Sequence, residues 1–203
     1  MTRTLVIDTA TAACSVALFD ADLLFAEVYQ EVGRGHAERL MPMIASLPDG
    51  GRADRLLVDC GPGSFTGVRV GLAAARALAL GWNVPVNGYS SMAAIASTGA
   101  TIAQQLAVAI IGGHGEFFVQ AYACDPLRPM SELASLAPEA AARAMAADHV
   151  FGSAAERLVE LRGYGTAHTC LPRAADAMRL AGLAALPPSP IYGRGADAKP
   201  AAA

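Results

Sequence analysis

The residues best placed to do chemistry are an aspartate near the end of a predicted strand and a glycine-rich turn before a predicted helix. Asp8 stands near the end of the apolar, β-branched run 4–9. A carboxylate there could hold Mg²⁺ through water, or it could cap or form a local turn. Residues 9–13 contain no glycine that would admit a phosphate closely, which favours the local role.

The glycine-rich turn spans residues 61–67 and reads Gly-Pro-Gly-Ser-Phe-Thr-Gly. Its glycines permit positive φ and close backbone approach, and Ser64 or Thr66 could cap the helix that follows. The N–H groups of such a helix start could hold an anion, but no lysine follows as it does in a phosphate-binding loop. A structural turn and an anion contact both stay open. The residues that a nucleotide or anion could contact are Asp8, Thr9, Gly63, Ser64, Thr66 and Arg69.

Metal and nucleophilic catalysis have little support in the sequence. A helical metal site would need two histidines four residues apart, but Leu40 stands at that spacing after His36. The other histidines, His114, His149 and His168, are isolated from one another. No Ser/His/Asp or Cys/His arrangement can be assembled, and the four single cysteines fit reduced cytosolic thiols. We expect no catalytic residue, no metal and no cofactor in the chain alone.

Hydrophobic periodicity predicts an α/β protein. The first half shows strands at 4–9, 14–19, 23–29, 56–60 and 84–87, and helices at 36–47, 66–82 and 90–97. This order is that of the ribonuclease-H-like lobe of actin-like ATPases, the ASKHA fold. The second half predicts a shorter copy, with strands at 106–111, 116–124 and 149–151 and helices at 138–147, 153–161 and 173–183. We expect two similar lobes, 1–100 and 101–190, and a flexible tail, 191–203.

The helix predicted at 66–82 is depleted of bulky side chains. Gly67, Gly71, Ala74 and Gly81 lie along one side of it. A glycine inside a helix costs about 0.5–1 kcal/mol relative to alanine, so close packing must compensate for it. That packing could be within the chain or against a helix of another protein.

The amino-acid composition excludes some classes of protein. Among 203 residues 54% are hydrophobic and the net charge is −3, which argues against disorder and against a large basic nucleic-acid footprint. The N-terminal apolar run is too short for a signal peptide, and no run approaches the roughly 20 apolar residues of a membrane span.

Several blocks of sequence resemble the TsaB (YeaZ) family. They are Leu-Val-Ile-Asp-Thr-Ala-Thr at 5–11, Cys-Ser-Val-Ala-Leu at 14–18, His-Ala-Glu-Arg-Leu-Met-Pro at 36–42, Gly-Pro-Gly-Ser-Phe-Thr-Gly-Val-Arg-Val-Gly-Leu at 61–72 and Val-Pro-Val at 84–86. The resemblance covers about residues 3–96. Tyr192 and Arg194 continue it near the C-terminus.

The resemblance implies a cytoplasmic, non-catalytic scaffold subunit of the machinery that makes N6-threonylcarbamoyladenosine at adenosine 37 of tRNAs reading ANN codons. Its implied partners are the catalytic paralogue TsaD, the ATPase TsaE and, in their absence, a second copy of itself. It would meet tRNA only indirectly, and ATP only in the assembled complex. The implied interface residues are His36, Leu40, Met43, Ile44, Gly67, Val70, Gly71, Ala74, Ala77 and Leu78.

The sequence departs from the family pattern in two places, and two other functions remain as alternatives. Residues 111–116 read Ile-Gly-Gly-His-Gly-Glu where the family usually has an Asp-Ala-Arg-like segment, and the linker 48–55 is short. The alternatives are a stand-alone ATPase of the same fold and a metal-dependent hydrolase or transferase related to metallopeptidases.

Overall fold

The computed structural model describes residues 2–193 and contains two β-sheets. The first sheet comprises β1 (Arg3–Asp8), β2 (Ala13–Asp20), β3 (Leu23–Glu31), β4 (Arg55–Asp59) and β5 (Val86–Tyr89), in the order β3-β2-β1-β4-β5. The first three strands are antiparallel, whereas β4 and β5 run parallel to β1. The carboxyl ends of β1, β4 and β5 therefore meet at one edge, where open α/β sheets commonly bind ligands.

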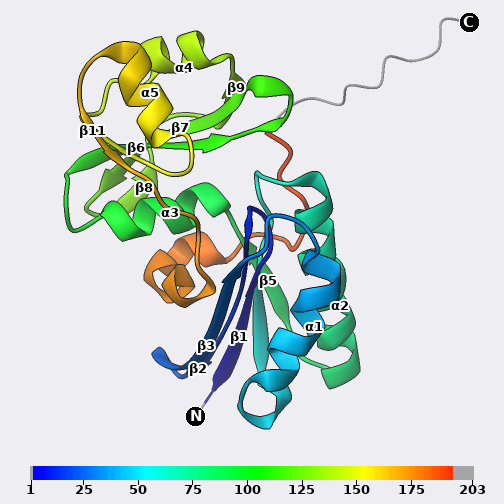
Figure 1. The fold of residues 1–203 in the computed structure, drawn as a ribbon. Helices are drawn as coiled ribbons and strands as arrows, with labels where there is room; N and C mark the ends of the chain where they lie inside the picture. The colour runs from blue at the N-terminus through cyan, green and yellow to red at the C-terminus, as the bar shows by residue number, and fades with distance from the viewer. Residues whose placement is uncertain (1, 194–203) are drawn as a thin grey trace, which may run out of the picture.

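Both faces of the first sheet are covered. Along β1, Leu5 and Ile7 pack with α1 (His36–Ser46) and α2 (Phe65–Trp82), while Val6 joins the core on the opposite face. This is the alternation expected of a strand that is buried on both sides. Figure 1 shows α1 and α2 side by side on one face of this sheet.

The second sheet repeats the first. It comprises β6 (Gln105–Ile111), β7 (Phe117–Cys124), β8 (Leu127–Pro129), β10 (His149–Phe151) and β11 (Thr166–His168), with β9 (Ala134–Leu136) paired to β7. The order β8-β7-β6-β10-β11, antiparallel and then parallel, matches β3-β2-β1-β4-β5 strand for strand. The helices α4 (Pro138–Ala144) and α5 (Ala155–Arg162) pack against its outer face. The predicted ribonuclease-H-like fold with two similar lobes is confirmed.

Two helical segments lie between the sheets. These are α3 (Ser91–Gly99) and the 3₁₀ segment η3 (Ala174–Ala184), and their buried side chains form one core with residues of both sheets. The layers are therefore α1/α2, first sheet, α3/η3, second sheet and α4/α5 (Figure 1).

Several predicted elements need correction. The helix expected at 173–183 is η3, and it contacts β1, β2, β3 and β5 of the first sheet although it falls within the range predicted for the second lobe. The strand expected at 84–87 is β5, shifted by two residues, and the helix expected to reach residue 147 ends at Ala144. The three-residue strands β8, β9 and β11 and the 3₁₀ turns η1 (Pro48–Gly51) and η2 (Gly113–Gly115) were not predicted.

Most of the predicted flexible tail, residues 194–203, lies outside the described residues. Within the described part of the chain, no helix is long and apolar enough to cross a membrane.

Candidate functional site: the β1–β4–β5 edge and the α1–α2 surface

The glycine-rich turn connects β4 to α2 and is fixed by its own hydrogen bonds. Ser64 is the N-cap of α2, and its Oγ accepts a hydrogen bond from the Gly67 N–H at 3.2 Å. The Ser64 N–H donates to the Ala10 carbonyl at 2.6 Å. The turn is therefore tied to the loop that follows β1.

The glycines of this turn are required by that loop. A Cβ on Gly63 would clash with the Ala10 carbonyl, and one on Gly67 would clash with the Thr9 carbonyl. A Cβ on Gly71 would come within 2.5 Å of Thr9 Oγ1, which donates to the Gly67 carbonyl at 2.7 Å. Packing within the chain thus explains why glycine stands at these three positions. It does not explain Gly81, where a Cβ would meet nothing within 4 Å.

Two buried carboxyl groups face each other at the carboxyl ends of β1 and β4. Asp8 and Asp59 are both fully buried and share a hydrogen bond. The Tyr89 hydroxyl donates to Asp8 Oδ2 at 3.1 Å. Asp59 accepts hydrogen bonds from the Gly61 N–H at 2.7 Å and from the Ser91 hydroxyl, which lies 2.6 Å from its Oδ2. The pair therefore links three strand ends to the glycine-rich turn and to α3.

Burial raises the pKa of both carboxyl groups because it penalises the charged form. The pKa of Asp59 is raised further by the negative charge of Asp8. Hydrogen bonds from Asp59 and Tyr89 partly counteract the rise in the pKa of Asp8. The two carboxyl groups therefore share a proton, as expected when two buried carboxyl groups lie in contact.

The structure does not gather the predicted nucleotide-contact residues around one cavity. Asp8 and Thr9 are buried, Gly63 is closed by the Ala10 carbonyl, and Ser64 and Thr66 are exposed. Arg69 lies over the Phe65 ring at 3.5 Å and donates to the Tyr192 hydroxyl at 3.3 Å. A nucleotide contact at these residues stays a prediction.

The predicted interface residues divide by burial. His36, Leu40, Met43 and Ile44 on α1, and Gly67 and Gly71 on α2, lie in the chain's own core. His36 Nε2 is 3.2 Å from the Ala13 carbonyl, which explains how a histidine is accommodated there. Val70, Ala74 and Leu78 are half-buried, and Ala77 is exposed. The role of these ten residues in an interface is still a prediction, but buried ones could act only by positioning others.

The surface that these helices present is formed by other residues. We call it the α1–α2 surface; its members are Ala37, Met41 and Ala45 on α1 and Ala73, Ala77 and Leu80 on α2. Leu80 is 85% exposed and Met41 46% exposed. Both sets recur at spacings of three or four residues, so each lies on one side of its helix. Charged residues of the same helices, such as Arg39 and Arg76, are exposed as well.

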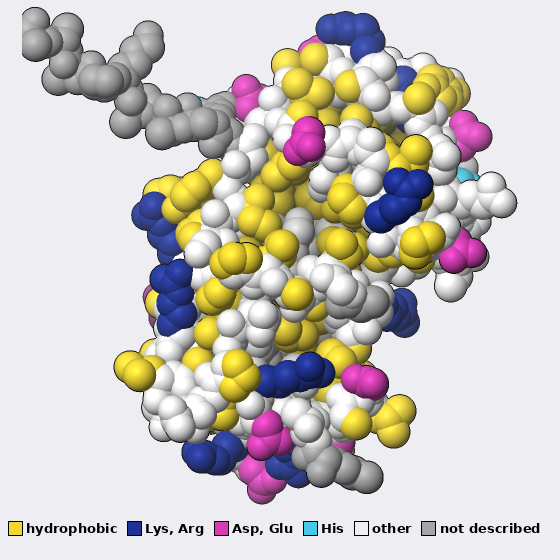
Figure 2. All heavy atoms as spheres, turned by 180° about the vertical axis from the view of Figure 1, so that it is seen from behind, with side chains coloured by type: hydrophobic (Ala, Val, Ile, Leu, Met, Phe, Trp, Pro, Cys, Tyr) yellow, Lys and Arg dark blue, Asp and Glu magenta, His cyan; other side chains and the backbone are white. Residues whose placement is uncertain are grey.

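Basic side chains are dispersed on the face of the molecule turned away from the viewer in Figure 1. Figure 2 shows Arg side chains both at the rim of that face and within it, and apolar side chains gathered in its middle. This distribution lacks the clustered positive charge of a nucleic-acid footprint.

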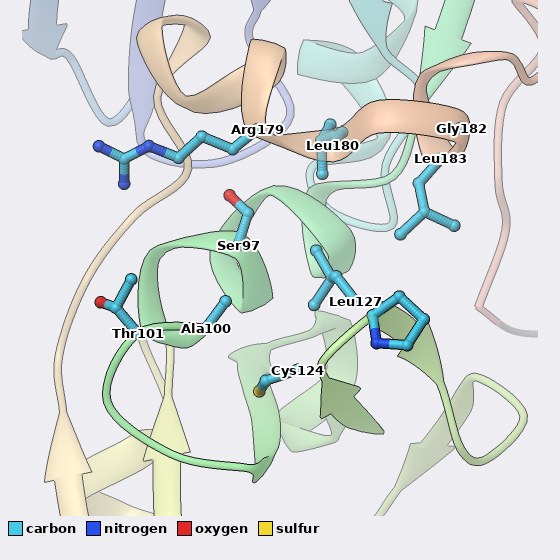
Figure 3. A pocket seen from close by; sticks show the side chains of 10 residues that line it. Ser97, Ala100, Thr101, Cys124, Leu127, Arg179, Leu180, Gly182 and Leu183 are labelled. Atoms are coloured by element: carbon cyan, nitrogen blue, oxygen red, sulfur yellow. The ribbon is translucent and has the colours of Figure 1, made fainter.

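A cavity of about 530 Å³ lies between α3, the turn between β7 and β8, and η3 (Figure 3). Most of the side chains that line it are apolar, and the charged one among them, Arg179, pairs with Asp176 at 3.3 Å. The Ser97 hydroxyl donates to the Ala94 carbonyl. The cavity therefore offers no acid–base pair, and none of the predicted site residues lines it.

Residues 2–193 contain no group of three or more His, Cys, Asp or Glu side chains that could hold a metal ion. Of the residues at this edge, Asp8 was predicted from the sequence, whereas Asp59, Tyr89 and Ser91 were not. A signal for Asp59 was present, since it follows the apolar run 56–58, as Asp8 follows the run 5–7.

The chain matches known proteins over most of its length. Residues 28–183 match the family described as "TsaD: tRNA N6-adenosine threonylcarbamoyltransferase". The threonylcarbamoyladenosine biosynthesis protein TsaB of Escherichia coli is 41% identical over 102 residues, which are 46% of this chain and 42% of that protein. The Bacillus subtilis TsaB is 35% identical over 100 residues, 47% of this chain and 44% of that protein.

The aligned part of the chain thus spans less than half the length of these curated relatives. A solved structure titled "YeaZ from Pseudomonas aeruginosa" superposes with a TM-score of 0.80 at 29% identity, covering 95% of this chain and 100% of that one. A second Pseudomonas aeruginosa structure, described as similar to peptidase YEAZ, gives a TM-score of 0.81 at 31% identity, covering 96% and 100%. The glycine-rich turn, the paired sheets and these likenesses all point to one family. The chain therefore belongs to the TsaD family and, within it, to the TsaB (YeaZ) proteins.

Proposed function

We propose that this chain is a non-catalytic subunit in the synthesis of N6-threonylcarbamoyladenosine in tRNA, and that it acts by pairing with a catalytic paralogue of the TsaD type. The observation that carries the proposal is the α1–α2 surface, on which Leu80 and Met41 are exposed beside four alanines. Exposed apolar residues grouped on adjacent helices are typical of protein contacts, and alanines let two helices approach closely. The names of the TsaB relatives supply the pathway.

Three features support a non-catalytic role. The Asp8–Asp59 pair is buried and its oxygens accept hydrogen bonds from the chain's own donors. The loop carbonyls close the turn at Gly63 and Gly67. In the second lobe, the strands that correspond to β1 and β4 end in Ile111 and Phe151, so that lobe adds no carboxylate at the matching positions. The ATPase TsaE would join the assembled pair, and ATP would bind only there.

Pairing is tested with two matched substitutions. Leu80→Arg should lower the amount of TsaD-type paralogue that co-purifies by at least about tenfold, because a charge in a helix contact costs 1.4 kcal/mol or more. Leu23→Arg is the control, since Leu23 is the 78% exposed first residue of β3 and belongs to neither α1 nor α2. Circular dichroism should show both variants folded. Equal capture of the two variants would refute the interface.

The enzymatic alternatives are tested on the isolated chain. Incubated with Mg²⁺ and ATP, or with metal ions and peptide, it should show no turnover above a blank. Turnover that Asp8→Asn abolishes would establish a stand-alone ATPase and contradict the proposal.

The chain is also expected to pair with a second copy of itself when the paralogue is absent. Light scattering gives the molar mass in solution of the native protein and of Leu80→Arg, and it would detect the pair.

A further inference from the structure

Two histidines on neighbouring strands of the second sheet face each other. β10 and β11 are parallel, and Phe151 lies directly opposite His168. Because side chains alternate along a strand, His149, Phe151 and His168 share one face of the sheet. Nδ1 of His149 lies 3.0 Å from Nε2 of His168. Both residues are partly exposed, so solvent and small ions can reach this pair.

The His168 ring packs on a neighbouring aromatic ring. The His168 ring stacks on Phe151 with centroids 4.2 Å apart and planes at 8°. Burial, and then the neighbouring His149, lower the pKa of His168, which favours the neutral ring near pH 7. A neutral imidazole is the form that binds metal ions.

We propose that His149 and His168 together chelate a divalent transition-metal ion, with Cu²⁺ or Ni²⁺ preferred. The facing nitrogens lie 3.0 Å apart, so metal–nitrogen bonds of about 2.05 Å from both can reach one ion once the rings turn their lone pairs toward it. Cu²⁺ binds nitrogen ligands most tightly among the divalent first-row ions, which gives the expected preference.

The ion replaces a hydrogen bond between the rings. In the free pair one facing nitrogen carries a proton and the other accepts it. On binding, that proton moves through solvent to the other nitrogen of the same ring, so a neutral pair releases none. Among the described residues no third His, Cys, Asp or Glu completes a cluster with the pair, and water fills the remaining positions.

This site is independent of the proposed pairing function. β10 and β11 belong to the second sheet, whereas α1 and α2 cover the first (Figure 1). Loss of metal binding would therefore leave the α1–α2 surface intact, and the two proposals can fail separately.

The test is calorimetric titration of tag-free protein with NiCl₂, repeated with CuCl₂ and ZnCl₂. We expect one Ni²⁺ per chain, tighter binding of Cu²⁺ and weaker binding of Zn²⁺. His149→Asn and His168→Asn should each lower the Ni²⁺ affinity at least tenfold. Two controls should bind like the native chain: His114→Asn, which removes an exposed single histidine, and Cys170→Ser, which removes the thiol two residues beyond His168.

Two results would overturn the proposal. One is the absence of saturable Ni²⁺ binding to the native chain up to about 1 mM, which corresponds to a binding free energy of about 4 kcal/mol. The other is unchanged binding in the variant that carries both His149→Asn and His168→Asn. Circular dichroism of each variant verifies that a lost site is not a lost fold.

Discussion

Asp8 and Asp59 hold the strand ends together through a shared proton. A buried carboxylate is costly unless it is hydrogen-bonded, and two ionised carboxylates in contact also repel each other. Tyr89, Ser91 and the Gly61 N–H supply donors, and the proton shared by the pair removes the repulsion. The edge of the sheet where ligands often bind is thus occupied by the chain's own polar groups.

This pair should make the protein less stable as pH rises. Its folded pKa values are raised above those of the unfolded chain, so the native state binds more protons, and its stabilising effect is lost as pH rises through the raised values. Stability should be greatest where the pair is protonated and should fall from about pH 4 toward neutral and beyond, by at most about 1.4 kcal/mol per pH unit for one proton. Urea unfolding at several pH values measures the slope.

Asp59→Asn should flatten this slope. The amide can donate to Asp8 and accept from the Gly61 N–H, as a protonated carboxyl group could, but it cannot ionise. Asp22→Asn is the control because Asp22 lies exposed in the turn between β2 and β3. If Asp59→Asn keeps the native slope, the pair does not share a proton in the way described.

Sequence could identify some of these residues and not others. An aspartate ending an apolar run was informative for Asp8, and the same signal extends to Asp59. The meeting of His149 with His168 depends on the register of β10 and β11, and a three-residue strand leaves too little periodicity to predict that register. Helical periodicity correctly indicated the burial of Leu40 and Ile44, but not the exposure of Met41, and it cannot distinguish a chain's own core from a partner's surface.

At the scale of elements, α2 shows why a helix can contain three glycines. Two of them, Gly67 and Gly71, let the helix start approach the loop after β1, which sets the position of the glycine-rich turn. The third, Gly81, faces open space near the C-terminal end. The same residue type therefore has opposite consequences at the two ends of one helix.

Gly67→Ala and Gly81→Ala form a matched pair that tests this difference. Gly67→Ala should destabilise the protein by about 1–3 kcal/mol, because the new methyl group overlaps the Thr9 carbonyl and backbone must move. Gly81→Ala should stabilise it by up to about 1 kcal/mol, since alanine favours the helix and the site has room. Denaturant midpoints compare the two. Similar shifts for both would show that the loop contact does not constrain α2.

The elements were predicted best where apolar runs are long. β1, β2, β6 and β7 have six to eight residues each, and their predicted positions were nearly correct. The missed strands β8, β9 and β11 have three residues, and pairing partners supply most of what specifies them. The segment η3 has an amphipathic pattern that suits a helix, and only the packing between the sheets determines its 3₁₀ form.

At the scale of the whole molecule, the two lobes share a core. α3 and η3 contribute Met92, Ile95 and Leu180 to a cluster that also contains Val6 of the first sheet and Phe118 of the second. Arg173 extends this connection at the surface, where its guanidinium contacts Glu27 of β3 at 2.7 Å. A core that continues from one sheet to the other favours a single cooperative unfolding unit over two independent lobes.

Leu158→Ala tests this cooperativity from the far side of the second lobe. Leu158 is fully buried between α5 and the second sheet, outside the shared core, and its truncation should cost about 2–5 kcal/mol. Trp82, the chain's single tryptophan, lies at the end of α2 in the first lobe and reports unfolding there by fluorescence. If the lobes unfold together, Leu158→Ala shifts the Trp82 transition and the far-ultraviolet circular dichroism transition equally. A Trp82 transition that keeps its native midpoint would show instead that the lobes unfold separately, and that α3 and η3 do not transmit stability between the sheets.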